Sequence, residues 1–203
     1  MRLRNVKNAS EIVKKHPLVI KYVNEKTFGN SNPIHLEIGS GKGDFLIGMA
    51  KKYPNINFVG IEKYESVLVR ALEKIEELPN NLKFMAVDAK NLEEIILIKI
   101  KALYLNFSDP WPKHRHEKRR LTSKEFLLLY EKIFEKQIDI YLKTDNKNFF
   151  SYSLESLSQN NYTLAKVSLD LHQTDIPNVM TEYEQKFSAK GETINYLHAT
   201  KMI

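Results

Sequence analysis

Short apolar runs alternate along the chain with stretches in which apolar residues recur every three or four positions. The apolar runs predict β-strands, and the periodic stretches predict amphipathic α-helices. Strands are predicted at residues 34–38, 57–61, 82–87, 102–107, 138–143, 162–171 and 193–200. Helices are predicted at residues 17–26, 44–52, 65–77, 92–98, 123–135 and 148–158.

Strands that alternate with helices predict a doubly wound α/β fold, in which a mostly parallel sheet carries helices on both faces. We expect one domain at residues 34–203, preceded by a basic arm and leading helix at residues 1–33. In such sheets ligands bind beyond the carboxyl ends of the strands. Residues that directly follow each strand are therefore the candidates for chemistry.

Composition narrows the class of protein. The chain has 203 residues, of which 42% are hydrophobic, and this is enough for one domain with a substantial core. It contains no cysteine, which excludes a disulfide framework and a thiolate metal site. No apolar run approaches the length of a membrane span, and the N-terminus lacks the apolar middle of a signal peptide. We therefore expect a cytoplasmic protein with no membrane partner.

The net charge of +6 is concentrated in two segments. Residues 113–120 carry five Lys or Arg against one Glu, and residues 1–26 carry seven against two, so the rest of the chain is mildly acidic. A charge run is often only a solvated face. Two concentrated basic segments on an acidic body instead favour a polyanionic partner that is bound at defined places.

The segment after the first predicted strand contains three glycines, at positions 39, 41 and 43. Alone, such a loop is a weak signal, but glycines let the backbone turn sharply and approach a ligand closely. The spacing is G-x-G-x-G, and Asp44 occupies the place of the last glycine of a dinucleotide-binding motif. Glu37 and Asp44 would repel a pyrophosphate and favour an ammonium or sulfonium. The segment therefore predicts a cationic cofactor such as S-adenosylmethionine.

Acidic residues also follow the next three predicted strands. Glu62 lies about 20 residues after the glycines, where a carboxylate can accept hydrogen bonds from both hydroxyls of a ribose. Asp88 is placed to accept a bond from an adenine amino group, and a helix cap is the alternative. Asp109 follows the fourth strand, which lies beside the first strand in a doubly wound sheet. We expect Asp109 to face the cofactor loop.

Trp111 lies between Pro110 and Pro112, and the basic run begins at the next residue. Two prolines around this tryptophan predict a stiff, extended exit from the fourth strand. The indole is a candidate for stacking on a base or for walling the pocket, and a place in the core is the alternative. Because the basic run adjoins the predicted cofactor site, we interpret it as functional and the polyanion as RNA.

Together these residues resemble the tRNA (guanine-N7)-methyltransferase family over nearly the whole chain. The resemblance is carried by EIGSGKG at 37–43, GIEKY at 60–64, NFSDPWPKHRHEKRR at 106–120, LKTDN at 142–146 and TEYE at 181–184. The DPWPK block with its basic extension is highly specific, whereas methyltransferases at large share the glycine loop. The resemblance implies a Rossmann-like fold and the transfer of a methyl group from S-adenosylmethionine to N7 of guanine 46, a variable-loop base of tRNA.

The resemblance also implies the roles of individual residues. Cofactor contacts are implied for Glu37, Gly39, Gly41, Gly43, Glu62, Asp88 and Asp109. Contacts with the target guanosine are implied for Lys113, Asp145, Thr181, Glu182, Tyr183 and Glu184. Contacts with the RNA are implied for His114, Arg115, His116, Lys118, Arg119 and Arg120.

Guanine N7 carries a free lone pair at neutral pH, so its attack on a methyl sulfonium needs no prior deprotonation. The enzyme then has to align the nucleophile, the methyl group and the leaving sulfur, and to exclude water. Methylation leaves the base cationic, and nearby carboxylates would stabilise the developing charge. We assign this catalytic role first to Asp109, with Asp145 and Glu184 as further candidates.

Three other functions stay open on the residues alone. They are a methyltransferase of another base or amino group in RNA, a nucleotide-dependent oxidoreductase, and a non-catalytic RNA-binding module. The glycine spacing and the acidic residues oppose the oxidoreductase, and the full set of acidic strand ends opposes the binding module. Arg and Lys crowd His114 and His116, so we expect no metal. A monomer and a homodimer are both compatible with the sequence.

Overall fold

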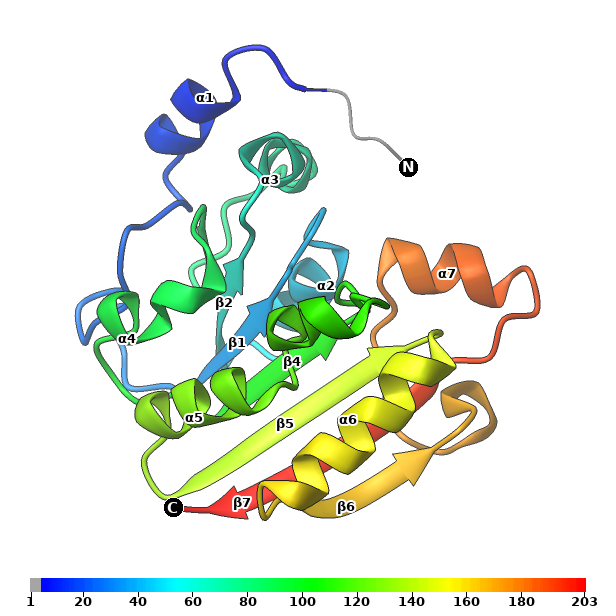
Figure 1. Ribbon diagram of the computed structural model, residues 1–203. Coiled ribbons are helices and arrows are strands. Elements are labelled where there is room, and N and C mark those ends of the chain that lie inside the picture. Colours follow the sequence, from blue (N-terminus) through cyan, green and yellow to red (C-terminus); the bar gives the residue numbers. More distant parts are fainter. Residues whose placement is uncertain (1–4) are drawn as a thin grey trace.

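The sheet is built as the hydrophobic pattern predicts. A computed structural model describes residues 5–203 (Figure 1). The strands in this part of the chain are β1 (Ile34–Ile38), β2 (Asn57–Ile61), β3 (Leu82–Met85), β4 (Ala102–Asn106), β5 (Gln137–Thr144), β6 (Thr163–Ser168) and β7 (Asn195–Met202). They form one sheet in the order β3-β2-β1-β4-β5-β7-β6. β1 to β5 run parallel to one another, and β7 is antiparallel to both β5 and β6, so the mostly parallel, doubly wound sheet is confirmed.

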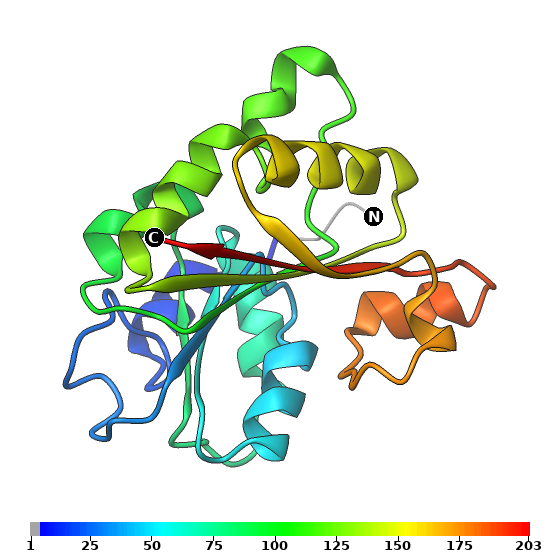
Figure 2. The ribbon, with the colours of Figure 1, turned by 90° about the horizontal axis from the view of Figure 1, so that it is seen from below.

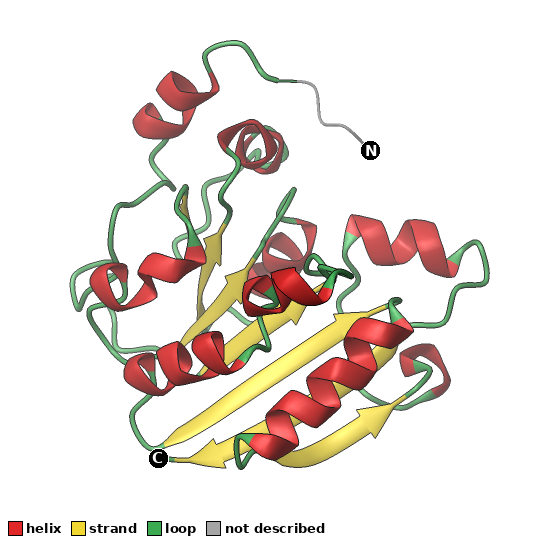
Figure 3. Cartoon of the chain, in the orientation of Figure 1, coloured by secondary structure: helices red, strands yellow, loops and turns green. Residues whose placement is uncertain are grey.

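Helices cover both faces of this sheet, also as predicted (Figures 2 and 3). They are α1 (Ala9–Lys15), α2 (Asp44–Lys52), α3 (Glu65–Leu72), α4 (Leu92–Ile95), α5 (Lys124–Ile133), α6 (Lys147–Gln159) and α7 (Glu182–Ser188). α2 and α3 lie on one face, and α4, α5 and α6 lie on the other. Within residues 5–203 no helix combines the length and the apolar character needed to cross a bilayer.

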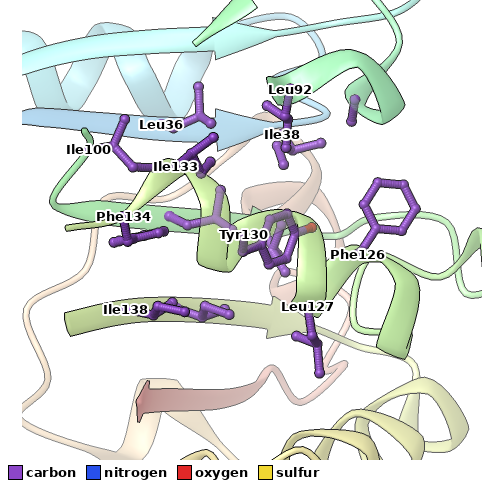
Figure 4. Packing of buried hydrophobic residues seen from close by; sticks show 14 of the residues in the cluster. Leu36, Ile38, Leu92, Ile100, Phe126, Leu127, Tyr130, Ile133, Phe134 and Ile138 are labelled. Carbon is purple, nitrogen blue, oxygen red and sulfur yellow. The ribbon is translucent and has the colours of Figure 1, made fainter. Parts of the chain in front are cut away.

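Two apolar clusters hold the helices on the sheet. The larger one lies beneath α4, α5 and α6, and Tyr130 of α5 is fully buried at its centre (Figure 4). The hydroxyl of Tyr130 donates to the carbonyl of Leu121 at 2.9 Å, so the buried polar group is satisfied. The smaller cluster lies beneath α2 and α3 around Phe58 and Phe84. Each large side chain buried in this way contributes about 1.5–3 kcal/mol to stability.

The predicted leading helix at residues 17–26 is wrong. The helix of this region is α1, which ends before Pro17, and the residue before a proline is driven out of the helical region. After a turn, the following residues bridge two segments that are distant in the sequence, with Val19 opposite Phe84 of β3 and Val23 opposite Ile96. The amide of Phe84 donates to the carbonyl of Leu18 at 2.8 Å. Leu18 and Val23 are buried there. Packing against the sheet edge therefore outweighs the helical pattern of this segment.

Two predicted helices are shorter than expected. α3 ends at Leu72 and not at residue 77, and α4 is a single turn that ends at Ile95 and not at residue 98. The chain leaves α4 because Leu97 donates its amide to the carbonyl of Val23 at 2.9 Å. The segment at residues 17–26, which was predicted to be a helix, thus also contributes to the end of α4.

Candidate functional site

The loop between β1 and α2 is bent by its three glycines. Gly39, Gly41 and Gly43 have φ angles of 78°, 57° and 76°, a left-handed region that other residues rarely adopt. At Gly43 a Cβ would lie 2.9 Å from the Cβ of Ala71 in α3. The tight turn expected from the spacing is present, and at Gly39 and Gly41 no side chain would keep a ligand away from the backbone.

Glu37 lies in β1 at the base of this loop, and only 2% of its surface is exposed. Its Oε1 accepts a hydrogen bond from Asn106 at 2.7 Å, whereas its Oε2 is buried without a partner. Burial raises the pKa of Glu37 to about 8, although the bond from Asn106 and the charge of Lys143 oppose the shift. A buried oxygen without a donor fits the ammonium of an amino acid, which would supply the donor and favour the ionised carboxylate.

Glu62 directly follows β2 and is fixed by the backbone of two loops. Its Oε2 accepts from the amide of Gly41 at 3.0 Å, and its Oε1 accepts from the amide of Tyr64 at 2.9 Å. Burial raises the pKa of Glu62 against these bonds, and the negative charge of Asp109 adds to the rise. The carboxylate keeps lone pairs for ribose hydroxyls.

Asp88 follows β3 and has a partner for each oxygen. Lys63 donates to its Oδ2 at 2.7 Å, and the amide of Lys90 donates to its Oδ1 at 3.1 Å. The second bond caps the short 3₁₀ helix η1 (Ala89–Asn91), so the cap that we gave as the alternative role is confirmed. The hydrogen bond from Lys63 lowers the pKa of Asp88. A contact with adenine would have to use the lone pairs that remain.

Asp44 contributes less negative charge to the loop than we expected. Its carboxylate forms an ion pair with Lys74 at 2.6 Å. Lys42, in the same loop, pairs with Glu182 at 2.6 Å and so ties the loop to α7. Among the acids predicted at the cofactor site, those without an ion-pair partner within residues 5–203 are Glu37, Glu62 and Asp109.

The predicted extended exit from β4 is wrong, because the chain bends at two places. Phe107 and Trp111 have φ angles of 49° and 41°, which cost about 1–3 kcal/mol each and persist only where the surroundings hold them. Arg120 is part of those surroundings. Its guanidinium donates to the carbonyls of Pro110 at 3.2 Å and Trp111 at 3.1 Å, and it lies 4.1 Å from the ring centre of Tyr152. Asp109 lies between the two bends and is exposed.

The basic run forms the short 3₁₀ helix η2 (His114–Arg119) beside this loop. Five of its side chains are exposed, namely those of Lys113, His114, Arg115, Lys118 and Arg119. The guanidinium of Arg119 lies 4.9 Å from the ring centre of Trp111, and His116 meets the same indole edge-on at 5.6 Å. Trp111 is thus half-buried under the basic run and outside the main core. Within residues 5–203 no three His, Asp or Glu side chains group as metal ligands would.

Asp145 and α7 form the opposite side of the site. The hydroxyl of Tyr183 donates to Asp145 at 2.9 Å. The ring of Tyr183 packs against Phe107 with 4.9 Å between ring centres and against Phe187 with 4.1 Å. Tyr183 stays 40% exposed. Thr181 caps α7, and its hydroxyl accepts from an amide of the helix at 2.9 Å.

The structure does not place Glu184 where a substrate could touch it. Glu184 is fully buried and pairs with Lys143 of β5 at 2.6 Å. His172 and Asn178 also contact its carboxylate, at 2.9 Å and 2.5 Å. Asn106 and Lys143, the partners of the buried acids Glu37 and Glu184, were not predicted from the sequence. Both are polar residues at the carboxyl ends of their strands, and this signal is visible in the sequence.

The chain is similar to known methyltransferases. The family described as "Putative methyltransferase" matches residues 31–197. The tRNA (guanine-N(7)-)-methyltransferase of Geobacillus thermodenitrificans is 53% identical, with 96% of this chain and 94% of that protein aligned. The protein of the same name from Listeria welshimeri is 56% identical over 86% of this chain and 83% of its own. The solved structure of the 16S rRNA methyltransferase KamB covers 91% of this chain and 95% of its own, with a TM-score of 0.65 at 14% identity, and shows the fold alone.

Proposed function

The chain belongs to the tRNA (guanine-N(7)-)-methyltransferase family, and on that premise we propose that it transfers a methyl group from S-adenosylmethionine to N7 of guanine 46 of tRNA. The observation that carries the proposal is the buried oxygen of Glu37 that has no hydrogen-bond donor. A protein rarely buries such a group without a purpose. An amino-acid ammonium would satisfy it, and S-adenosylmethionine contains one.

We propose that the acids around the glycine loop hold the cofactor. Glu37 would accept from its ammonium, Glu62 from its ribose hydroxyls and Asp88 from its adenine amino group. The left-handed glycines let the backbone approach closely. The bound cofactor supplies an electrophilic methyl group. The residues of this chain then have to orient the guanine and exclude water.

Asp109, Asp145 and Tyr183 are the residues that we assign to the base. Asp109 is exposed at the mouth of the loop, and its charge acts on Glu62. It is placed to accept from the N–H edge of guanine and to stabilise the positive charge that forms on the ring. Asp145 is held by Tyr183, whose exposed ring offers a surface for stacking.

The exposed cations beside the loop are assigned to the RNA backbone. Guanine N7 lies on the major-groove edge, which A-form RNA hides in a deep, narrow groove, so the target has to be a loop base or a displaced one. Lys113, Arg115, Lys118 and Arg119 would hold the phosphates around it. One chain supplies every residue named here, so a monomer suffices for the site and a homodimer would contain two. We also propose that the protein acts in the cytoplasm.

The deciding experiment incubates the protein with labelled S-adenosylmethionine and tRNA that lacks N7-methylguanosine, and then separates the nucleosides. We expect label in N7-methylguanosine, and a tRNA in which adenine replaces guanine 46 should accept none. Label in another nucleoside would show a methyltransferase of different specificity. Binding of tRNA without any labelled product would leave only an RNA-binding role. The Asp109→Asn variant should form product more slowly, and full turnover with unchanged affinities would remove Asp109 from the mechanism.

A further inference from the structure

A buried ion pair joins β5 to the segment at residues 171–188. The ammonium of Lys143 lies 2.6 Å from Oε2 of Glu184, and the two side chains are 5% and 0% exposed. The same ammonium donates to the carbonyl of Val179 at 3.0 Å and to Oδ1 of Asn178 at 3.1 Å. An ammonium has three hydrogens to donate. Lys143 therefore has all of its donors engaged with this one segment.

The carboxylate of Glu184 is equally occupied. Its Oε1 accepts from Asn178 at 2.5 Å and lies 2.9 Å from Nε2 of His172. Its Oε2 accepts from Lys143 and, at 3.4 Å, from the amide of Thr181. A carboxylate offers about four lone-pair sites. No site is left for a base, and the side chain has no exposed surface through which a base could reach it.

The other ionic contact of α7 lies at the surface. Glu182 pairs with Lys42 and Lys74, and its side chain is half exposed. Exposed pairs of this kind contribute little in water, whereas loss of one member of a buried pair leaves an uncompensated charge. The start of the segment is anchored by a small apolar cluster around Leu171. The buried pair therefore fixes the segment at the start of α7.

We propose that Lys143 and Glu184 are positioning residues that place α7 over the site and do not touch the substrate. The inference rests on the proposed function, because it concerns the site at which guanosine would bind. Tyr183 is one residue from Glu184, and it reaches Asp145 only while α7 keeps its place. Contact with the base is then left to Asp145 and Tyr183. A displacement of about 1 Å at such a remote support lowers turnover by roughly 100-fold.

A second-site rescue separates positioning from contact. The variants are Glu184→Gln, Lys143→Met and the two combined, compared by kcat and KM for tRNA at saturating S-adenosylmethionine. We expect each single change to lower kcat/KM about 100-fold, because it leaves a buried group without its partner. The double variant removes both charges and should recover at least about 10-fold. If Glu184 contacts guanosine, the double variant will be as impaired as Glu184→Gln. Asp175, an exposed acid of the same segment, serves as control, and Asp175→Asn should stay within a few-fold of wild type.

Carboxyl labelling of the unaltered protein tests the same inference where a variant fails to fold. A water-soluble carbodiimide with an amine nucleophile should modify Glu182 in the free protein and leave Glu184 unmodified, with or without tRNA. Modification of Glu184 in the free protein, followed by its protection by tRNA, would overturn the inference. Labelling does not require turnover. Formation of N7-methylguanosine by the wild type tests the proposed function separately.

Discussion

Glu37 and Glu184 are the most deeply buried carboxylates within residues 5–203, and they differ in how fully their oxygens are satisfied. Glu37 has one partner, Asn106, and one oxygen with none, and burial raises its pKa to about 8. Burial alone would raise the pKa of Glu184 too, but the charge of Lys143 and the hydrogen bonds to the carboxylate outweigh it, and the pKa is lowered. A buried acid with an oxygen that lacks a hydrogen-bond donor can accept one from a ligand. A buried acid whose oxygens all have partners within the protein stabilises the fold.

The largest expected effect comes from replacing Glu37 or Glu184 and measuring the free energy of unfolding. Glu184→Ala leaves the ammonium of Lys143 buried without its counter-charge, and we expect the free energy of unfolding to fall by about 3–5 kcal/mol. Glu37→Gln removes an acid that already lacks one partner, so its stability should match or exceed that of the wild type. Urea unfolding of the three proteins measures both effects. Equal losses from the two changes would show that the acids have the same role.

The hydrophobic pattern predicts nearly all of the sheet, because each strand's period depends only on its own residues. The segment at residues 17–26 fails because its neighbour across the sheet edge decides its conformation, and that neighbour is far away in the sequence. The site divides in the same way. The turn at the glycines and the acid after β2 follow from local residues, and these predictions need no knowledge of tertiary contacts.

The role of Glu184 could not be predicted from local residues. Its partners His172, Asn178 and Lys143 come from separate segments, and only the folded chain brings them together. A sequence motif marks Glu184 and Glu37 as equally important. It does not tell which of the two has its partners within the protein.

The next largest effect concerns affinity for the cofactor. Glu37→Gln removes the charge that would hold the ammonium, and a hydrogen bond to a charged group contributes about 1.5–3 kcal/mol, so affinity should fall about 10- to 150-fold. Calorimetric titration with S-adenosylhomocysteine measures the loss. Titration with 5′-methylthioadenosine, which lacks the amino-acid group, is the matched control and should be nearly unaffected. Equal losses for both compounds would place the ammonium elsewhere.

The raised pKa of Glu37 predicts a proton that leaves when the cofactor binds. Below pH 8 the free protein holds this proton, and the ammonium favours the ionised form, so affinity should rise with pH by up to about 10-fold per unit up to a pH of about 8. Titration in buffers of different ionisation enthalpy measures the released proton. Glu37→Gln should abolish the release, and a release that persists in the variant would have another source.

The same group makes stability depend on pH in the opposite direction. The pKa of Glu37 is raised from 4.5 to about 8, so between these values the folded protein holds a proton that the unfolded chain has lost. This contribution to the free energy of unfolding is present at low pH and is lost as pH rises through about 8. Urea unfolding of the wild type and Glu37→Gln between pH 5 and pH 9 isolates it, because the variant lacks the titrating group. Parallel pH profiles for the two proteins would refute it.

The basic run at residues 113–120 also contains both side chains that are hydrogen-bonded within the protein and side chains that are exposed. The effects that we expect from substitutions there are the smallest. Arg120 is engaged with the loop carbonyls, whereas Lys113 and Arg115 are exposed. Replacing Lys113 and Arg115 with Ala should flatten the slope of log affinity for tRNA against log salt by about 1.4–1.8. The thermal midpoint should stay within about 2 °C, as expected for surface changes. Arg120→Ala should lower the thermal midpoint and change the slope little, because it releases the bend at Trp111 and removes at most one phosphate contact. An unchanged slope in the double variant would place the RNA on another surface.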